Sequence, residues 1–238
     1  MNRAFVRLTR DELSRQEILR YLGYRGQEVG PELSERFDRA VDGCLAHIRP
    51  VYVWREFPLE FQPDGVLVSG TNVRLTGNGI LRHLNGAKMA ALLAATLGAE
   101  AERYLRALEH TDMTGALIAD AVCTECVEKT CDRAGEEIRA FAARGGYSVN
   151  SRFSPGYGDL PLEIQPEFLS ALDSMKAIGL TCSSSFLLIP RKSVTAVIGF
   201  FAGERETEKE PPCASCNLRQ NCIYRKAGTS CGHQETDR

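Results

Sequence analysis

A segment near the C-terminal end of the sequence, Val194–Phe201, is apolar at nearly every position. Strands with one solvated face alternate apolar and polar residues, whereas strands buried on both faces read as continuous apolar runs. The segment therefore predicts a central strand of a sheet that is covered on both sides. The chain has 238 residues, which is enough to build the core that such a strand requires.

Helix signals occur in groups along the chain. Helical spacing or end signals mark six segments. These are the segment from the capping box Thr9–Glu12 to Gly23, the segment from Pro31 to Pro50, Leu84–Leu97, Glu100–Leu108, Asp112–Gly145 and the segment from Pro166 to Gly179. We expect Leu117 to be buried in the longest of them, and Met175 to lie on the apolar stripe of the last.

Strand signals fall between these groups. Val51–Trp54 is rich in β-formers, and Val66–Leu75 reads as a hairpin that turns at Gly70-Thr71-Asn72. Ser185–Ile189 reads as a strand joined to Val194–Phe201 by a four-residue connection. Helices, a hairpin, more helices and further strands in this order predict an α+β fold with a central, mainly antiparallel sheet and flanking helices.

Charge and hydropathy exclude several classes of function. The 29 basic and 31 acidic residues leave a net charge of −2, so no global field draws the chain to nucleic acid or an anionic membrane. No apolar run approaches the roughly 20 residues of a transmembrane helix, and the N-terminus lacks an apolar signal region. We therefore expect a cytoplasmic protein with no nucleic-acid or membrane partner. The sequence has no P-loop, and Gly77-Asn78-Gly79 is too short for a dinucleotide fingerprint.

The composition changes after Gly203. Glu204–Glu210 reads as a charged linker whose end is stiffened by Pro211-Pro212, and the remainder is rich in cysteine. The sequence thus predicts two parts, a domain over residues 1–203 and a small cysteine-rich tail over residues 204–238.

The tail contains four cysteines in a C-x2-C-x5-C-x8-C pattern: Cys213, Cys216, Cys222 and Cys231. In a reducing compartment, spaced thiols indicate a metal or redox role before a disulfide framework. Four thiolates suit either tetrahedral zinc or an iron–sulfur cluster. The spacing matches neither a standard zinc ribbon nor a standard ferredoxin, so a tail with unmetallated thiols is the alternative.

Four of the other cysteines lie on segments that read as helices. Cys44 lies on an apolar stripe, and Cys123, Cys126 and Cys131 lie within the long helix. Buried cysteines in helices mostly pack as small hydrophobes, and Cys131 falls off the face that Cys123 and Cys126 can share. We expect core thiols here, with a metal site as the weaker alternative.

The stretch Arg152–Pro161 suits neither a helix nor a strand. Pro155 fixes one backbone dihedral, and Gly156 permits a positive φ angle and close approach of a ligand to the backbone. Arg152 offers a planar fork for a carboxylate, and Tyr157 offers an aromatic face with a polar tip. The stretch can hold a small zwitterionic ligand, or it is an ordinary turn between two elements.

The order of motifs around this stretch carries a family resemblance. Arg152–Tyr157 resembles the R-x-x-x-G-Y element of the activation domain of cobalamin-dependent methionine synthase, and a helix, Gly179-Leu180-Thr181 and Ser185–Pro190 follow in a similar order. Three segments resemble the stand-alone activation subunits of bacteria whose methionine synthase lacks this domain: Tyr21-Leu22-Gly23-Tyr24, Arg152–Gln165 and Lys192–Ala196. The resemblance covers roughly residues 10–202 and implies a methionine synthase activation-domain-like fold.

The resemblance also implies a ligand, a role and partners. The ligand is S-adenosylmethionine, and the role is reductive reactivation, in which an electron and a methyl group convert cob(II)alamin to methylcobalamin. The expected partners are a cobalamin-binding methionine synthase subunit, which holds the cobalamin, and an electron donor such as flavodoxin or ferredoxin. The chain would be a component of a methyltransferase system and is not expected to turn over alone.

Site residues follow from the same resemblance. Arg152 would pair with the methionine carboxylate through both arms of its fork. Pro155 and Gly156 would form a wall of the site, and Tyr157 would lie near the sulfonium or the adenine.

An acidic residue on the long helix would take the ligand's ammonium group. Glu125 is the candidate and Glu128 is the alternative; a solvated helix face is the simpler interpretation of both. The chain departs from the full-length enzymes at Val194-Thr195, where they have an aromatic pair. The cysteine-rich tail has no counterpart in the activation domain of those enzymes.

Two other functions stay open at this point. The chain could be a metal-binding or iron–sulfur redox or regulatory protein whose tail is the working part. It could also reactivate another corrinoid methyltransferase.

Overall fold

The computed structural model describes residues 1–203 of the chain. The four cysteines of the predicted metal site, Cys213, Cys216, Cys222 and Cys231, lie outside the described residues. Within residues 1–203, none of the helices combines the length and apolarity that crossing a bilayer requires.

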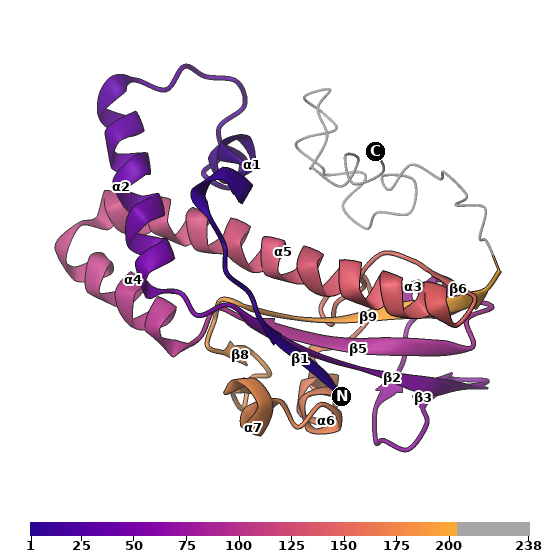
Figure 1. Ribbon diagram of the computed structural model, residues 1–238. Coiled ribbons are helices and arrows are strands. Elements are labelled where there is room, and N and C mark those ends of the chain that lie inside the picture. Colours follow the sequence, from indigo (N-terminus) through magenta and orange to yellow (C-terminus); the bar gives the residue numbers. More distant parts are fainter. Residues whose placement is uncertain (204–238) are drawn as a thin grey trace. The chain divides into compact units, whose positions relative to one another are not determined.

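A seven-stranded antiparallel sheet forms the centre of the described part (Figure 1). Its strand order is β4-β3-β2-β5-β9-β6, and β1 pairs with the first residues of β2. A separate two-stranded sheet consists of β7 and β8. The strands are β1 (Asn2–Phe5), β2 (Val51–Gln62), β3 (Gly65–Val68), β4 (Arg74–Leu75), β5 (Met89–Thr96), β6 (Tyr147–Val149), β7 (Thr181–Cys182), β8 (Leu188–Ile189) and β9 (Ser193–Ala202). The predicted antiparallel α+β fold is confirmed.

Strand β9 is covered on both faces, as its apolar sequence predicts. Its backbone pairs with β5 on one side and with β6 on the other. Val197 and Phe201 belong to the hydrophobic core on one face of the sheet, and Ile198 and Phe200 belong to the core on the other face. Alternate side chains of this strand therefore hold two separate layers against the sheet.

Helices supply these two layers (Figure 1). The long helix α5 packs on one face through Cys131 and Ile138. Helices α3, α6 and α7 pack on the other face, where Phe168 is fully buried. Helices α1, α2 and α4 surround the first half of α5, around Val122. The helices are α1 (Arg15–Tyr21), α2 (Pro31–His47), α3 (Asn78–Leu84), α4 (Ala99–Thr111), α5 (Met113–Arg144), α6 (Gln165–Ala171) and α7 (Ser174–Ile178), with 3-10 turns η1 (Arg10–Glu12) and η2 (Leu162–Ile164).

The segment Leu84–Leu97 is not a helix, contrary to the prediction. It comprises the end of α3 and then β5, which lies between β2 and β9 in the sheet. Every residue of β5 after Met89 is buried. A strand buried on both faces has no polar side, so its apolar run cannot be told from a buried helix by periodicity.

The predicted hairpin between Ser185–Ile189 and β9 is also wrong. Only Leu188–Ile189 is a strand, and it pairs with Thr181–Cys182. One edge of β9 is paired with β5, and the other is paired with β6 and with the segment around Asn150 and Phe153, so this segment does not pair with β9. Instead, the backbone N–H of Ser183 donates to Leu187 O at 2.8 Å and closes a separate turn.

Two side chains predicted to be buried are exposed. Leu117 is 60% exposed, because α5 packs on its neighbours through Ile118 and the residues that share its face. Met175 is 66% exposed. The predicted last helix breaks at Asp173, where φ is 47°, and the break resets the helical phase before Met175.

Candidate ligand-binding site

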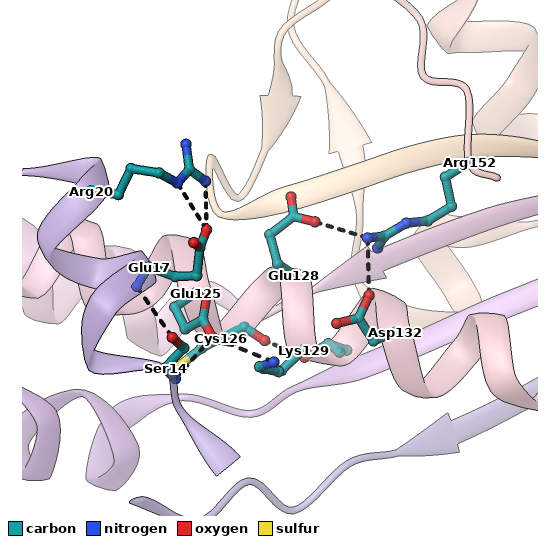
Figure 2. A network of polar contacts seen from close by, with 10 residues as sticks. Ser14, Glu17, Arg20, Glu125, Cys126, Glu128, Lys129, Asp132 and Arg152 are labelled. Carbon is teal, nitrogen blue, oxygen red and sulfur yellow. Dashed lines mark hydrogen bonds and ion pairs between the residues drawn. The ribbon is translucent and has the colours of Figure 1, made fainter. Parts of the chain in front are cut away.

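One face of α5 carries polar side chains at four-residue intervals: Asp120, Thr124, Glu128 and Asp132. Residues four apart are neighbours on a helix surface, so this set extends for about 18 Å at a rise of 1.5 Å per residue. Arg152 lies opposite its C-terminal half (Figure 2). The Nη2 atom of Arg152 donates to Glu128 Oε2 at 3.0 Å and to Asp132 Oδ1 at 3.1 Å.

A second cation, Lys192, lies against the N-terminal half. Its Nζ is 2.8 Å from Asp120 Oδ1 and donates to Thr124 Oγ1 at 2.9 Å. The Lys192 side chain, directly before β9, is only 16% exposed. We call these residues the α5 row: Asp120, Thr124, Glu128, Asp132, Arg152 and Lys192. The α5 row thus presents groups of both charges along one helix face.

The two terminal nitrogens of Arg152 have different surroundings. Nη2 serves both carboxylates, whereas Nη1 is buried and has no hydrogen-bond partner. Burial opposes the guanidinium charge, but Cys131, Glu128 and Asp132 favour it, and the pKa of Arg152 is raised. The guanidinium therefore stays charged, and the two N–H groups on Nη1 have no acceptor among the described residues.

The loop Arg152–Pro161 is fixed to the edge of β9. Phe153 and Val197 exchange two backbone hydrogen bonds, with N···O distances of 3.0 and 2.8 Å. Within the loop, the N–H of Gly156 donates to Leu160 O at 2.8 Å. These bonds hold the backbone on either side of the predicted ligand wall.

The predicted loop residues differ in exposure. Pro155 is buried, Gly156 is exposed and Tyr157 is 54% exposed. The ring of Tyr157 meets the ring of Phe153 edge-on, with the centroids 6.2 Å apart. Pro155 thus anchors the loop, while Gly156 and Tyr157 lie at its surface.

Asp159 docks the loop on the first turn of α3. Its carboxylate accepts hydrogen bonds from Gly79 N at 2.8 Å and Asn78 N at 2.6 Å, which lowers the pKa of Asp159. A Cβ atom on Gly77 would lie 2.7 Å from Asp159 O, and one on Gly79 would lie 2.9 Å from Asp159 Oδ1. Glycine at both positions therefore allows the loop at Asp159 to lie close to the backbone of α3, which the sequence alone did not indicate.

Asp159→Ala is expected to lower the thermal midpoint of unfolding by a few degrees at neutral pH. The folded-state pKa lies below the ordinary 3.8, so the ionised carboxylate stabilises the fold above that value and loses this contribution as the pH falls through the lowered pKa. Thermal unfolding followed by circular dichroism should show the difference from wild type shrinking at acid pH. A difference that stays constant at acid pH would contradict this role.

Gly156→Ala is expected to destabilise the loop and weaken ligand binding. The φ angle of Gly156 is +87°, and an added Cβ would lie 3.0 Å from Leu162 Cδ2. Gly146→Ala is a matched control, because its φ is +76° but nothing lies within 4 Å of the added Cβ. Both variants should lose about 1 kcal/mol of unfolding free energy from backbone strain. Calorimetric binding should weaken only in Gly156→Ala; equal binding in both would refute the wall assignment.

The two candidate acids for the ammonium group have different surroundings (Figure 2). Glu125 is 2% exposed, accepts from Ser14 N at 3.1 Å and lies 3.6 Å from Lys129 Nζ. Glu128 is partly exposed and contacts Arg152. The structure therefore brings Glu128, rather than Glu125, to the arginine.

Val194 and Thr195, which stand where the full-length enzymes have an aromatic pair, lie on opposite faces of β9. Thr195 is buried and exchanges hydrogen bonds with the side chain of Gln165 at 2.9 and 3.0 Å. Val194 is half-buried and packs with the α5 side of the core. Of this pair, Val194 is the residue that lies on the side of the α5 row.

The cysteines of the helices are core thiols, as predicted. Cys44, Cys123 and Cys126 are buried in one cluster, with the first two Sγ atoms 3.6 Å apart. Cys131 is buried beside Arg152, and burial raises the pKa of its thiol to about 12 although the guanidinium acts in the opposite direction. Among residues 1–203, no group of three or more His, Cys, Asp or Glu side chains is arranged to hold a metal ion.

These features define an antiparallel α+β fold in which one long helix and an edge loop present paired charges. Among solved structures, the chain is similar to the crystal structure of the MetH reactivation domain bound to AdoHcy, with a TM-score of 0.64 and 16% identity over 86% of this chain and 80% of that chain. The chain therefore has a methionine synthase activation-domain-like fold. No protein-family model and no curated protein matches the sequence.

Proposed function

We propose that the chain binds S-adenosylmethionine at the α5 row and supports the reductive methylation of cob(II)alamin on a cobalamin-dependent methionine synthase. The observation that carries the proposal is the guanidinium of Arg152, which has a buried, unpartnered Nη1 atom beside two carboxylates. The similarity to a reactivation domain bound to AdoHcy supports the choice of ligand.

The residues present fit the amino-acid end of this ligand. Its carboxylate would accept from Arg152 in a charge-assisted contact. Its ammonium group would donate to Glu128, with Asp132 as a second acceptor, since both carboxylates already lie within hydrogen-bond distance of the same guanidinium. Tyr157 offers an exposed aromatic ring that favours a nearby sulfonium charge.

The chain contributes binding and orientation to the reaction. Bound S-adenosylmethionine would supply the methyl group, and an external donor the electron, for conversion of cob(II)alamin to methylcobalamin, with S-adenosylhomocysteine as the second product. Arg152 and Glu128 would hold the amino-acid end of the methyl donor. The loop Arg152–Pro161, which is hydrogen-bonded to β9, would keep the ligand at a fixed distance from α5. The partner subunit would hold the cobalamin, so the chain alone is not expected to turn over.

A reconstituted reaction tests the proposal. The full chain is mixed with a cobalamin-binding methionine synthase subunit in its cob(II)alamin form, S-adenosylmethionine and reduced flavodoxin, and the absorbance of methylcobalamin is followed. Methylcobalamin should form only when the chain is present. Formation at the same rate without the chain would refute the proposal.

The two alternatives predict different outcomes. A reactivator of another corrinoid methyltransferase would act only when that corrinoid protein replaces the methionine synthase subunit. If the tail is the working part of a metal-binding redox protein, replacing Cys213, Cys216, Cys222 and Cys231 by Ser should abolish function, and Arg152→Ala should have no effect. Under the present proposal, the serine variant keeps ligand binding.

A further inference from the structure

A groove of about 520 Å³ lies on α6 and α7, in the layer on the side of the sheet opposite α5 (Figure 1). Pro166, Leu169, Ser170 and Asp173 follow at three- and four-residue intervals, so one face of α6 and the turn after it form one wall. Residues of α7 and of the segment around β7 line the rest. The volume lies within the range of ligand sites, about 300–1,000 Å³.

We propose that this groove binds a short, extended peptide segment of a partner protein, with an apolar side chain next to a lysine or arginine. The proposal goes beyond ligand binding at the α5 row and does not depend on it. Because the groove and α5 belong to layers on opposite faces of the sheet, the two sites can be tested separately.

Apolar side chains form the floor and the rim of the groove. Leu169 and Leu180 are buried in the core beneath it, whereas Pro166 is exposed and Met175 is 66% exposed. A methionine adapts its shape to the side chain that packs on it. An apolar side chain of a bound peptide would cover Met175, whose exposure is otherwise unfavourable.

The charge beside the groove is negative. Asp173 lines the groove and is exposed. Glu167 lies near it, because burial and then the charge of Glu167 raise the pKa of Cys182, another lining residue. Within residues 1–203, neither carboxylate forms an ion pair, and Lys176, the basic residue of α7, does not line the groove. The groove therefore complements an incoming lysine or arginine.

An unused strand edge favours a peptide over a small polar ligand. Within the described residues, β7 pairs only with β8. Since Ser183 N bonds to Leu187 O, the alternation of an antiparallel pair directs the N–H and C=O of Cys182 away from β8. An extended peptide can bond to such an edge and place alternate side chains in a groove. The hydroxyl of Ser174, by contrast, already donates to Leu180 O at 2.9 Å.

The walls of the groove contain two residues with left-handed backbones. Asp173 has a φ angle of 47° and Phe186 one of 63°, and within residues 1–203 they are the two residues other than glycine with positive φ. Such backbones are unfavourable for residues with a Cβ and are concentrated at binding segments. Ser183 Oγ supports the turn at Phe186 by accepting from Leu187 N at 3.2 Å. The fold thus holds Phe186 beside the groove at a conformational cost.

The first test presents the immobilised full-length chain to a random heptapeptide library displayed on phage. Selection should enrich peptides that carry an apolar residue next to a lysine or arginine. The enriched peptide, synthesised with a fluorescein label, is then titrated with the chain by fluorescence anisotropy. Added salt should weaken its binding, since exposed ion pairs are screened. Enrichment of no peptide, or of peptides without a basic residue, would overturn the proposal.

The second test locates the peptide at the rim of the groove. Met175→Lys replaces an apolar contact by a charge that repels a basic peptide and should weaken it roughly tenfold. Met113→Lys is the matched control, because Met113 is 61% exposed on α5 and does not line the groove. Equal affinities of the two variants for the peptide would overturn the assignment of the groove.

The third test concerns the charge of Asp173. Asp173→Asn keeps a residue that tolerates a left-handed backbone but removes the carboxylate. Replacing the basic residue of the peptide by methionine should weaken binding to wild type roughly two- to fivefold and should change binding to Asp173→Asn less. An equal loss with both proteins would show that Asp173 does not pair with the peptide.

The remaining outcomes separate this inference from its alternatives. A second copy of the chain in the groove would appear in sedimentation velocity as a dimer that Met175→Lys dissociates, and this result would overturn the proposal. Met175→Lys should bind S-adenosylhomocysteine as wild type does, which shows that the variant is folded. If wild type binds the selected peptide but not S-adenosylhomocysteine, the proposed function fails and the present inference is supported.

Discussion

Arg152→Ala is expected to weaken the binding of S-adenosylmethionine roughly 10- to 150-fold. A hydrogen bond to a charged group contributes about 1.5–3 kcal/mol, and each 1.4 kcal/mol changes an affinity tenfold. The variant loses the donor that would face the ligand carboxylate and leaves Glu128 and Asp132 without their shared cation. Isothermal titration calorimetry against wild type measures the change.

Two controls accompany this variant. Arg152→Lys keeps the charge but not the fork, so it should recover only part of the lost affinity. Arg103→Ala removes an arginine whose side chain is 72% exposed and 3.7 Å from Glu100, and such a surface pair contributes little. Full affinity in Arg152→Ala, or the same loss in Arg103→Ala, would show that Arg152 does not hold the ligand.

Glu128→Gln is expected to weaken the ligand about tenfold, because a neutral amide cannot pair with its ammonium charge. Glu125→Gln is the matched control three residues earlier on α5. Its amide oxygen can still accept from Ser14 N, so the fold should be kept. Calorimetry should therefore show a loss only in Glu128→Gln, and a loss confined to Glu125→Gln would restore Glu125 as the ammonium partner.

The pH dependence of stability provides a separate test of the surroundings of Glu125. Burial raises the pKa of Glu125 above its ordinary 4.5. Folded wild type therefore holds a proton that the unfolded chain releases between 4.5 and the raised pKa, and its stability falls as the pH rises through that window. Denaturant titrations should show wild type losing stability relative to Glu125→Gln over this window. A constant difference would contradict the burial of a titrating carboxyl group at this position.

Elements with local end signals could be predicted from the sequence. Pro31 begins α2 and Asp112 caps α5, with Asp112 Oδ1 accepting from Gly115 N at 3.0 Å. Gly179 ends α7 with a φ of 68°. These signals depend on backbone geometry within one turn, so they can be recognised in the sequence.

Elements without such signals could not be predicted. Strand β1 (Asn2–Phe5) alternates half-buried and exposed residues and is defined by its backbone pairing with β2. Strand β5 is buried on both faces, which removes the alternation that marks a strand. In both cases the partner strand, distant in sequence, decides the structure.

The candidate site was predictable in its loop but not in its helix. Arg152, Pro155 and Gly156 lie within five residues of one another, and their types and order in the sequence indicate a ligand loop. Which carboxylate faces Arg152 depends on how α5 is rotated against the sheet, and this rotation is set by packing. The four-residue spacing of Glu128 and Asp132 is the signal that could have indicated the pair.

The most direct test of the account is calorimetric titration of the full-length chain with S-adenosylhomocysteine, the ligand named for the similar solved domain. Binding should be saturable with one ligand per chain, strongly weakened in Arg152→Ala and unchanged in Arg103→Ala. No binding to wild type, or equal binding to wild type and Arg152→Ala, would contradict it.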